Sequence, residues 1–285
     1  MQKDWYIVLG PAKTGTTVVA RTLLNAVTPD GFSMEPTSRH ELEALRGTKR
    51  VAVKIIFDTW RQQLTDLTAV CTGDARAGVP TTICLIRDPR DELVSRLHYF
   101  AYSFFATHPA TDEQCASWIR IFQKKEADPD GVSLLEMEEE LWSTFGEGFR
   151  PPPELHRSYL QFVEDLGALP ANKSNVLRYE DFIDGRIPRN LNGFLKGPQL
   201  VHPLEQRVLR SGSKGAWHRF FTDRDTEFYN RYFDHYLIKF DYPLARDVET
   251  GPPVSSSTGS AYVARLIDEA RAIYAQAARQ QSPMG

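Results

Sequence analysis

Short apolar runs alternate with helical patterns over the first 90 positions of the chain. Residues 5–10, 50–57 and 81–86 are compact and apolar, which is typical of buried strands. Residues 18–27 have apolar positions at helical spacing, and residues 60–70 have room for another helix. Strands joined through helices favour a parallel sheet with right-handed crossovers. We therefore predict an α/β fold of three layers, with helices on both faces of a central parallel sheet.

Residues 89–167 are expected to be mostly helical, and residues 176–179 are expected to add another strand. Pro153 is typical of a helix start, and Gly167 stands where a C-terminal cap belongs. Residues 126–140 carry seven acids and no base. We expect a solvated helical face there and no metal site, because consecutive glutamates cannot converge from one helix.

A linker rich in proline, serine and glycine is expected at residues 248–260, before a C-terminal amphipathic helix at 261–280. The apolar stripe of this helix predicts that it docks on the same chain or on a second copy, as in a homodimer. We expect residues 1–247 to form the main domain, with a helical insertion at about 107–167. The stripe consists of Tyr262, Leu266, Ile267, Ala270, Ile273, Tyr274 and Ala277.

Composition narrows the class of protein. The 285 residues are 41% hydrophobic and carry a formal charge of −3, so we expect a folded protein without the basic field that recruits nucleic acid. Three cysteines without a CxxC pair suggest neither a disulfide framework nor a zinc site. No apolar stretch approaches the roughly eighteen residues that span a bilayer. We expect a cytoplasmic location without stable membrane insertion.

The segment GPAKTGTT at residues 10–17 joins the first predicted strand to the first predicted helix. Its glycines let the backbone direct several N–H groups at one point, and the helix dipole adds to them. Thr16 stands where a Walker A loop requires lysine, and Lys13 lies inside the loop, which argues against an ordinary ATP or GTP site. Lys13 can still reach a bridging oxygen, while Thr16 and Thr17 donate hydroxyls. The segment therefore predicts a phosphate-binding loop.

A second signal, RDPRD at residues 87–91, follows the strand predicted at 81–86. Arg87 stands at the carboxyl end of that strand, where open α/β sheets bind ligands. A sharp turn at Pro89 would let the next helix bring Ser95 beside Arg87. A cation and a hydroxyl would then surround a second phosphate.

Together these segments resemble the sulfotransferases that use 3′-phosphoadenosine 5′-phosphosulfate (PAPS). The PKxGTT motif of that family is similar to residues 11–17, with one residue between proline and lysine. Its RxPxDxxxS motif is matched at residues 87–95, and its RxGxxGxW motif is matched by RSGSKGAW at 210–217. Its YED segment is matched at 179–181. The four matches follow the family order.

The resemblance implies roles for the matching residues, with PAPS as donor and 3′-phosphoadenosine 5′-phosphate (PAP) as product. The loop would hold the 5′-phosphosulfate, and Arg87 with Ser95 would hold the 3′-phosphate. Arg210 and the backbone of Ser211 and Gly212 would close over the 3′-phosphate, and Tyr179 would lie near the adenine. The implied loop residues are Ala12, Lys13, Thr14, Gly15, Thr16 and Thr17.

Sulfuryl transfer places charge on the leaving phosphate oxygen, so a preorganised cation there lowers the barrier. Lys13 is the expected cation. A sulfuryl group carries less charge than a phosphoryl group, and we therefore expect no metal. The acceptor hydroxyl or amine still needs a general base.

The expected base is Glu35. Small-molecule members of the family typically carry KxH, but Ile56 fills the histidine position after Lys54. The carbohydrate-modifying branch instead resembles a P-loop followed by a glutamate, with a lysine from the next strand beside it. Glu35 stands 22 residues after Lys13, and Lys54 fills the lysine position. Pro36 biases Glu35 toward extended backbone, whereas Glu41 and Glu43 are expected in a helix that begins near Ser38.

Other functions compete with this one. A P-loop kinase would need lysine after the second glycine and a magnesium-binding acid at a strand end. A nucleotide-binding module without turnover would keep the same binding residues. The acceptor is open among glycans, lipo-oligosaccharides and small metabolites. The aromatic residues between 99 and 105 either line an acceptor pocket or pack in a helical core.

Overall fold

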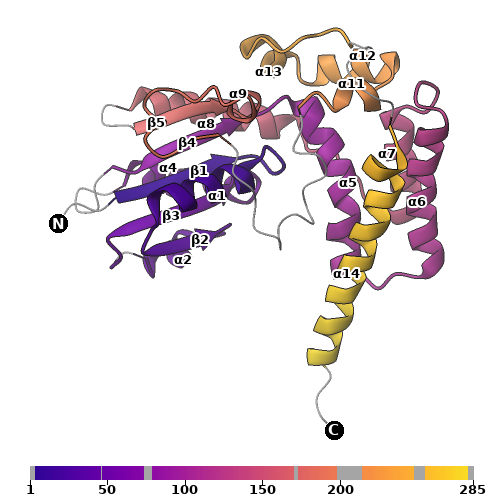
Figure 1. Ribbon diagram of the computed structural model, residues 1–285, viewed down its shortest axis with the longest axis horizontal. Coiled ribbons are helices and arrows are strands. Elements are labelled where there is room, and N and C mark those ends of the chain that lie inside the picture. Colours follow the sequence, from indigo (N-terminus) through magenta and orange to yellow (C-terminus); the bar gives the residue numbers. More distant parts are fainter. Residues whose placement is uncertain are drawn as a thin grey trace. The chain divides into compact units, whose positions relative to one another are not determined.

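A computed structural model describes residues 4–45, 47–73, 79–169, 173–197, 214–246 and 254–281 (Figure 1). The chain divides into two compact units. The first, which we call the sheet unit, contains Met1–Asp88 and Pro152–Val201. The second, the helical unit, contains Pro89–Pro151 and His202–Gly285. Each unit therefore combines two separated stretches of the chain.

The sheet unit is built on five parallel strands in the order β2-β3-β1-β4-β5. Its inner strands read as continuous apolar runs because both faces of a parallel sheet are covered. Ile7, Val8 and Leu9 of β1, for example, are fully buried. The predicted α/β fold with a central parallel sheet is confirmed. The strands are β1 Asp4–Gly10, β2 Gly31–Met34, β3 Arg50–Ile56, β4 Thr81–Ile86 and β5 Lys173–Arg178.

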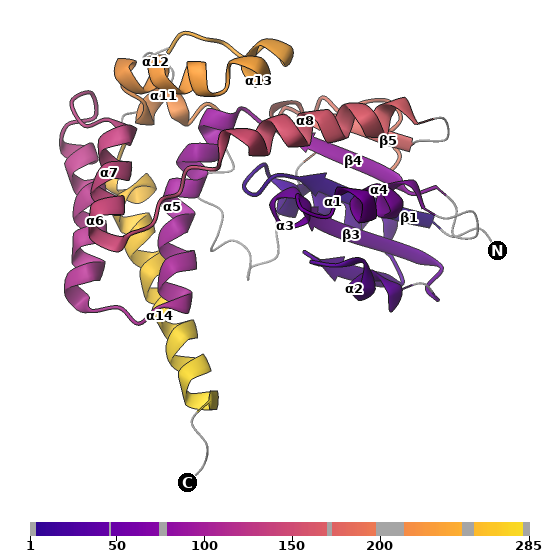
Figure 2. The same cartoon turned by 180° about the vertical axis from the view of Figure 1, so that it is seen from behind.

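Helices cover both faces of this sheet. Right-handed crossovers put α1 on one face and α4 and α8 on the other, in agreement with the contacts of α1 with β1 and β3 and of α4 with α8. Helix α8 lies along β5 (Figure 2). The helices are α1 Thr16–Val27, α2 Arg39–Glu43, α3 Phe57–Trp60, α4 Leu64–Thr72, α8 Pro153–Ala168 and α9 Tyr179–Ile183.

Helix α8 is tied to the sheet through Tyr159. Its hydroxyl lies 2.7 Å from the carbonyl oxygen of Leu85 and 3.1 Å from that of Leu9. The helix begins at Pro153, as predicted, but the predicted cap at Gly167 is wrong. The helix continues to Ala168 because buried Leu166 keeps the last turn packed.

The helical unit is built around α5, α6 and α14, and α14 packs on both of the other two. Its elements are α5 Pro89–Thr107, α6 Asp112–Ala127, α7 Leu134–Phe145, α11 Trp217–Phe220, α12 Asp223–Tyr232, α13 Asp234–Lys239, the 3-10 turn η1 Ser256–Thr258 and α14 Ser260–Gln281. Phe104 and Phe105 are buried against Trp118 and Phe145. This part of the aromatic cluster forms a helical core.

The C-terminal helix docks on its own chain through its first half. Tyr262, Leu266, Ile267 and Ala270 of the predicted stripe are buried, whereas Ile273 is 37% exposed. Docking on a second copy stays a prediction. No helix in the described part of the chain is long and apolar enough to cross a membrane.

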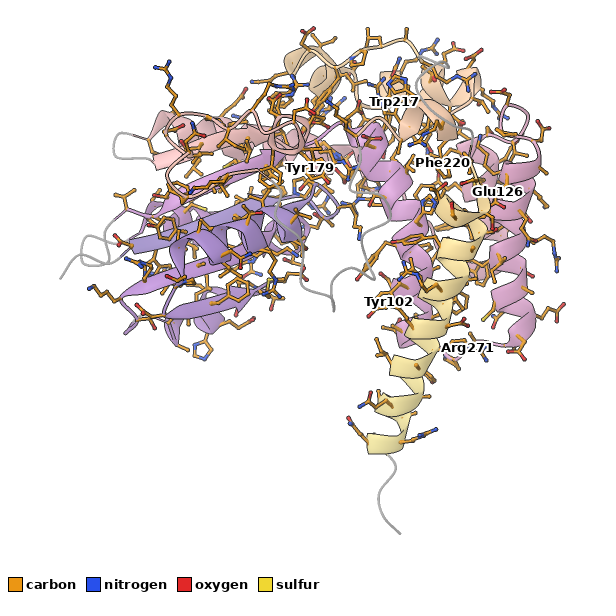
Figure 3. The ribbon with its side chains drawn as sticks, in the orientation of Figure 1. Tyr102, Glu126, Tyr179, Trp217, Phe220 and Arg271 are labelled. Carbon is orange, nitrogen blue, oxygen red and sulfur yellow. The ribbon has the colours of Figure 1, made fainter. Side chains whose placement is uncertain are left out.

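Two glutamates of the acidic stretch at 126–140 have partners within the helical unit. Glu126 accepts hydrogen bonds from the backbone N–H and the hydroxyl of Ser260, at 2.5 and 2.9 Å, and so fixes the start of α14 (Figure 3). Glu138 is 8% exposed and lies 3.2 Å from Arg150. The predicted solvated face is therefore wrong at Glu138, which is buried beside Arg150. The described residues contain no group of His, Cys, Asp and Glu side chains that could hold a metal ion.

Candidate functional site

The carboxyl ends of the strands gather the candidate residues of the sheet unit. Lys13 follows β1, Glu35 follows β2, Arg87 follows β4, and Tyr179 follows β5 directly. Lys54 lies near the end of β3 and pairs with Val8 and Met34. Because the strands are parallel, these ends lie at one edge of the sheet, which is where open α/β sheets bind ligands.

The loop between β1 and α1 requires glycine at position 15. Gly15 has φ 92°, a backbone conformation that residues with a side chain rarely adopt. A Cβ atom there would also lie 2.3 Å from two ring carbons of Tyr179. Lys13 is also left-handed, with φ 70°. The loop thus turns sharply under the ring of Tyr179.

The electrostatics of the loop favour an anion. The first N–H groups of a helix have no partner within the helix, and the helix dipole makes that end positive. Gly15 is the N-cap of α1 and offers no side chain to cap it, and the first turn carries no acidic residue. The Ala12 N–H, by contrast, donates to Asp58 Oδ2 at 2.8 Å. Asp58 belongs to none of the sequence motifs, and its only signal in the sequence is its position just after the end of β3.

Glu35, the predicted base, and Lys54, its predicted partner, are in direct contact. Lys54 is 3% exposed, and its Nζ donates to Glu35 Oε1 and, at 2.8 Å, to Thr17 Oγ1 of the loop. The Glu35 side chain remains 53% exposed. A half-exposed carboxylate is therefore connected through a buried lysine to the loop between β1 and α1.

The backbone of Glu35 differs from the prediction. Its φ is 55°, which is left-handed and not extended. Two contacts outweigh the bias from proline: the Glu35 N–H donates to Lys54 O at 2.8 Å, and Trp60 Nε1 donates to Pro36 O at 2.6 Å. Such a conformation costs roughly 1–3 kcal/mol, and residues held in this way cluster at functional sites.

The competing carboxylate Glu41 has a structural role. It lies in α2, as predicted, and accepts hydrogen bonds from the backbone N–H and hydroxyl of Thr37 and from Ser38. The hydrogen bonds from Thr37 lower the pKa of Glu41. This carboxylate is therefore held at the start of its helix.

Arg87 is held against the same loop. Its guanidinium donates to Lys13 O at 2.8 Å and lies 4.7 Å from the ring centroid of Tyr179. Arg87 and Tyr179 are 7% and 4% exposed. Glu180 accepts a hydrogen bond from the Asp88 N–H at 2.9 Å, and burial raises the pKa of Glu180. The YED segment thus supports both the loop and the end of β4.

Comparisons with known proteins were made on sequence and on structure. No protein-family model matches the chain, and no curated protein matches it in sequence. Among solved structures, the chain is similar to the crystal structure of mouse sulfotransferase SULT7A1 complexed with PAP. The two are 14% identical, with a TM-score of 0.42, over 95% of this chain and 90% of that chain.

The placement of the remaining predicted cofactor residues stays a prediction. Ser95 lies in α5 of the helical unit and Arg87 in the sheet unit, so their pairing stays a prediction. Arg210, Ser211 and Gly212 lie outside the described residues.

Asp91 and Arg90 connect the second and third motifs within the helical unit. The buried carboxylate of Asp91 accepts from the N–H groups of Gly215 and Trp217, at 2.6 and 2.9 Å. The guanidinium of Arg90 lies 3.7 Å from the ring centroid of Trp217. The motif spacing placed Asp91 in the family pattern, but its partners could not be predicted because they lie more than 120 residues away.

Proposed function

We propose that this protein is a PAPS-dependent sulfotransferase that transfers a sulfuryl group to a hydroxyl or amine. The observation that carries the proposal is the connection from Glu35 through Lys54 to Thr17 of the loop. A base and a phosphosulfate loop must lie within reach of each other for in-line transfer. A P-loop kinase is disfavoured, because Thr16 stands at the lysine position of Walker A.

The residues present suit PAPS as donor. The uncapped start of α1 would hold the 5′-phosphosulfate together with Lys13, Thr16 and Thr17. Tyr179 is packed between Gly15 and Arg87, so the adenine would lie near its ring edge. When bound, PAPS supplies an activated sulfuryl group on its 5′-phosphate.

Charge stabilisation is assigned to Lys13 and to the N–H groups of the first turn of α1. The backbone that carries these groups is held before reaction, since Arg87 donates to the Lys13 carbonyl and Tyr179 covers Gly15. Preorganised donors of this kind stabilise charge on a leaving oxygen without a reorganisation cost. No metal is required in this mechanism.

Proton removal is assigned to Glu35, with Lys54 as the residue that orients it. The 53% exposure of Glu35 leaves its second oxygen accessible to an acceptor hydroxyl. The acceptor class proposed is a glycan, lipo-oligosaccharide or small metabolite.

The proposal is tested by transfer from radiolabelled PAPS to a panel of sugars and small alcohols, with ATP and magnesium as the rival donor. Lys13→Ala should reduce turnover at saturating donor roughly a hundredfold to a thousandfold. Binding of PAP should weaken much less, because the lysine contact strengthens as the leaving oxygen gains charge. Unchanged turnover in this variant would contradict the proposal, as would phosphoryl transfer from ATP. Binding of PAP without transfer to any acceptor would favour the non-catalytic module.

A further inference from the structure

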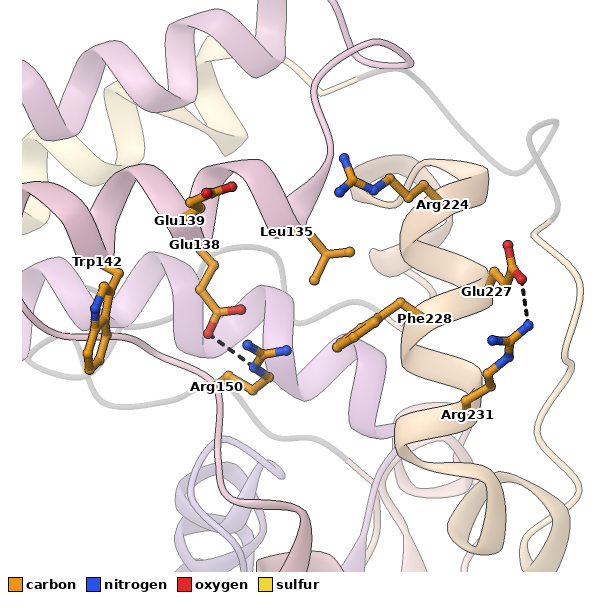
Figure 4. A pocket seen from close by; sticks show the side chains of 9 residues that line it. All are labelled: Leu135, Glu138, Glu139, Trp142, Arg150, Arg224, Glu227, Phe228 and Arg231. Carbon is orange, nitrogen blue, oxygen red and sulfur yellow. Dashed lines mark hydrogen bonds and ion pairs between the residues drawn. The ribbon is translucent and has the colours of Figure 1, made fainter.

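The helical unit contains a cavity that none of the residues assigned to sulfuryl transfer lines. Its volume is about 610 Å³. It lies between α7 and α12, with Arg150 contributed by the segment after α7 (Figure 4). The lining residues are Leu135, Glu138, Glu139, Trp142, Arg150, Arg224, Glu227, Phe228 and Arg231.

Two exposed aromatic side chains line this cavity. Trp142 is 61% exposed and Phe228 is 38% exposed, whereas Trp60, Trp118 and Trp217 are at most 1% exposed. Ligand pockets typically combine such aromatic surfaces with a few well-placed polar groups. The aromatic pair therefore suits a ligand that presents an apolar face.

The charged groups of the cavity balance one another. Three arginines and three glutamates line it, so their formal charges sum to zero. Two opposite pairs are in contact: Arg150 with Glu138 at 3.2 Å, and Arg231 with Glu227 at 2.6 Å. A compensated lining offers no net attraction to a phosphate or to an ammonium group. The chemistry of the cavity thus points to an uncharged ligand.

The ion pair of Arg150 and Glu138 is already held in place by neighbouring side chains. The guanidinium of Arg150 lies 5.2 Å from the ring centroid of Phe228 and 5.7 Å from that of Tyr232. Glu138 accepts a hydrogen bond from the Tyr229 hydroxyl at 3.4 Å, and burial raises the pKa of Glu138. A planar guanidinium and a carboxylate can each hydrogen-bond two hydroxyls at once. Their fixed positions lower the cost of ordering on binding.

We propose that this cavity binds a neutral oligosaccharide. A pyranose ring presents an apolar C–H face to Trp142 and hydroxyls to the surrounding guanidinium and carboxylate groups. A purely apolar ligand would remove water from these ion pairs and offer no hydrogen bonds to their remaining donors and acceptors, which is costly. The inference stands apart from the proposed sulfuryl transfer, because it uses none of the same residues.

The test uses the full chain and three neutral hexasaccharides: cellohexaose, maltohexaose and fully N-acetylated chitohexaose. Binding is followed by calorimetry and by the protection of tryptophan fluorescence from quenching by acrylamide. Exposed Trp142 should contribute most of the fluorescence that acrylamide quenches. At least one hexasaccharide should bind saturably and protect the fluorescence. Trp142→Ala should weaken binding roughly tenfold or more, Trp142→Phe should weaken it less, and Arg224→Ala should weaken it several-fold.

Ile238→Ala is the matched control, since Ile238 is 72% exposed on α13 and does not line the cavity. This variant should bind like the wild type. The proposal is overturned if none of the three sugars binds below about 10 mM, or if Trp142→Ala binds as well as the wild type. Tighter binding of adenosine or of a sulfated hexasaccharide at the same residues would also overturn it.

Discussion

Glu35 is distinguished from the neighbouring carboxylates by its partners. Its side chain contacts Lys54, whereas the side chain of Glu41 accepts hydrogen bonds from Thr37 and Ser38. The spacing from Lys13 and the resemblance to the carbohydrate-modifying branch singled out Glu35, and the structure places its side chain against Lys54. Its left-handed backbone could not be predicted, because the contacts that impose it come from Lys54 and Trp60, which the local sequence does not bring near.

The first prediction is that Glu35→Gln keeps PAP affinity and loses turnover by roughly a hundredfold to ten-thousandfold. Glutamine retains the shape of the side chain and an oxygen for Lys54, but it cannot accept a proton. Steady-state rates and calorimetry measure the two effects separately. Glu41→Gln is the matched control and should keep most activity. Retained turnover in Glu35→Gln, or its loss only in Glu41→Gln, would assign the base elsewhere.

The second prediction separates backbone strain from crowding at the loop. Gly15 and Gly185 both have positive φ, but only Gly15 would bring a Cβ atom against Tyr179. Gly185→Ala should therefore cost about 1 kcal/mol of stability from strain alone. Gly15→Ala should cost more and should also weaken PAP binding. Thermal unfolding and calorimetry measure both, and equal effects of the two variants would contradict the packing of Tyr179 on the loop.

At the scale of elements, strand ends were more predictable than helix contacts. The buried strands were predicted within a few residues because their apolar runs are read directly from the sequence. The stripe of α14 was predicted as well, but not that only its first half is covered. That limit depends on where α5 and α6 pack against α14, which no local pattern encodes.

The turn between α6 and α7 depends on a buried lysine. Lys125 is fully buried, and its Nζ donates to Pro129 O and Val132 O, each at 2.6 Å. Burial lowers the pKa of Lys125 to about 8. A neutral amine still has two N–H groups for these two carbonyls, so the contacts survive deprotonation.

The third prediction follows from this lowered pKa. Between pH 8 and the ordinary lysine pKa of 10.5, the unfolded chain binds more protons at this site than the folded chain does. The free energy of unfolding contributed by Lys125 therefore rises with pH across that window. The free energy of unfolding of the wild type, minus that of Lys125→Met, should therefore increase with pH by on the order of 3 kcal/mol. Denaturant titrations at several pH values measure it, and a constant difference would contradict the buried position of the amine.

At the scale of the whole molecule, the chain crosses between its two units several times. Each unit contains an early and a late stretch of the sequence. The sequence could not predict this division, because long-range contacts such as that of Asp91 with Trp217 define it. Arg87 and Ser95, the two residues predicted to bind the 3′-phosphate, belong to different units. The proposed recognition of the 3′-phosphate is therefore the prediction that draws on both units.

The most direct test is calorimetry of the wild-type chain with PAP and with adenosine 5′-monophosphate, which lacks the 3′-phosphate, in the presence of EDTA. The account predicts that PAP binds without metal. It also predicts at least roughly tenfold tighter binding of PAP, since each hydrogen bond to a charged oxygen contributes on the order of 1.5–3 kcal/mol. Equal affinity for the two nucleotides, or binding only of ATP with magnesium, would contradict it.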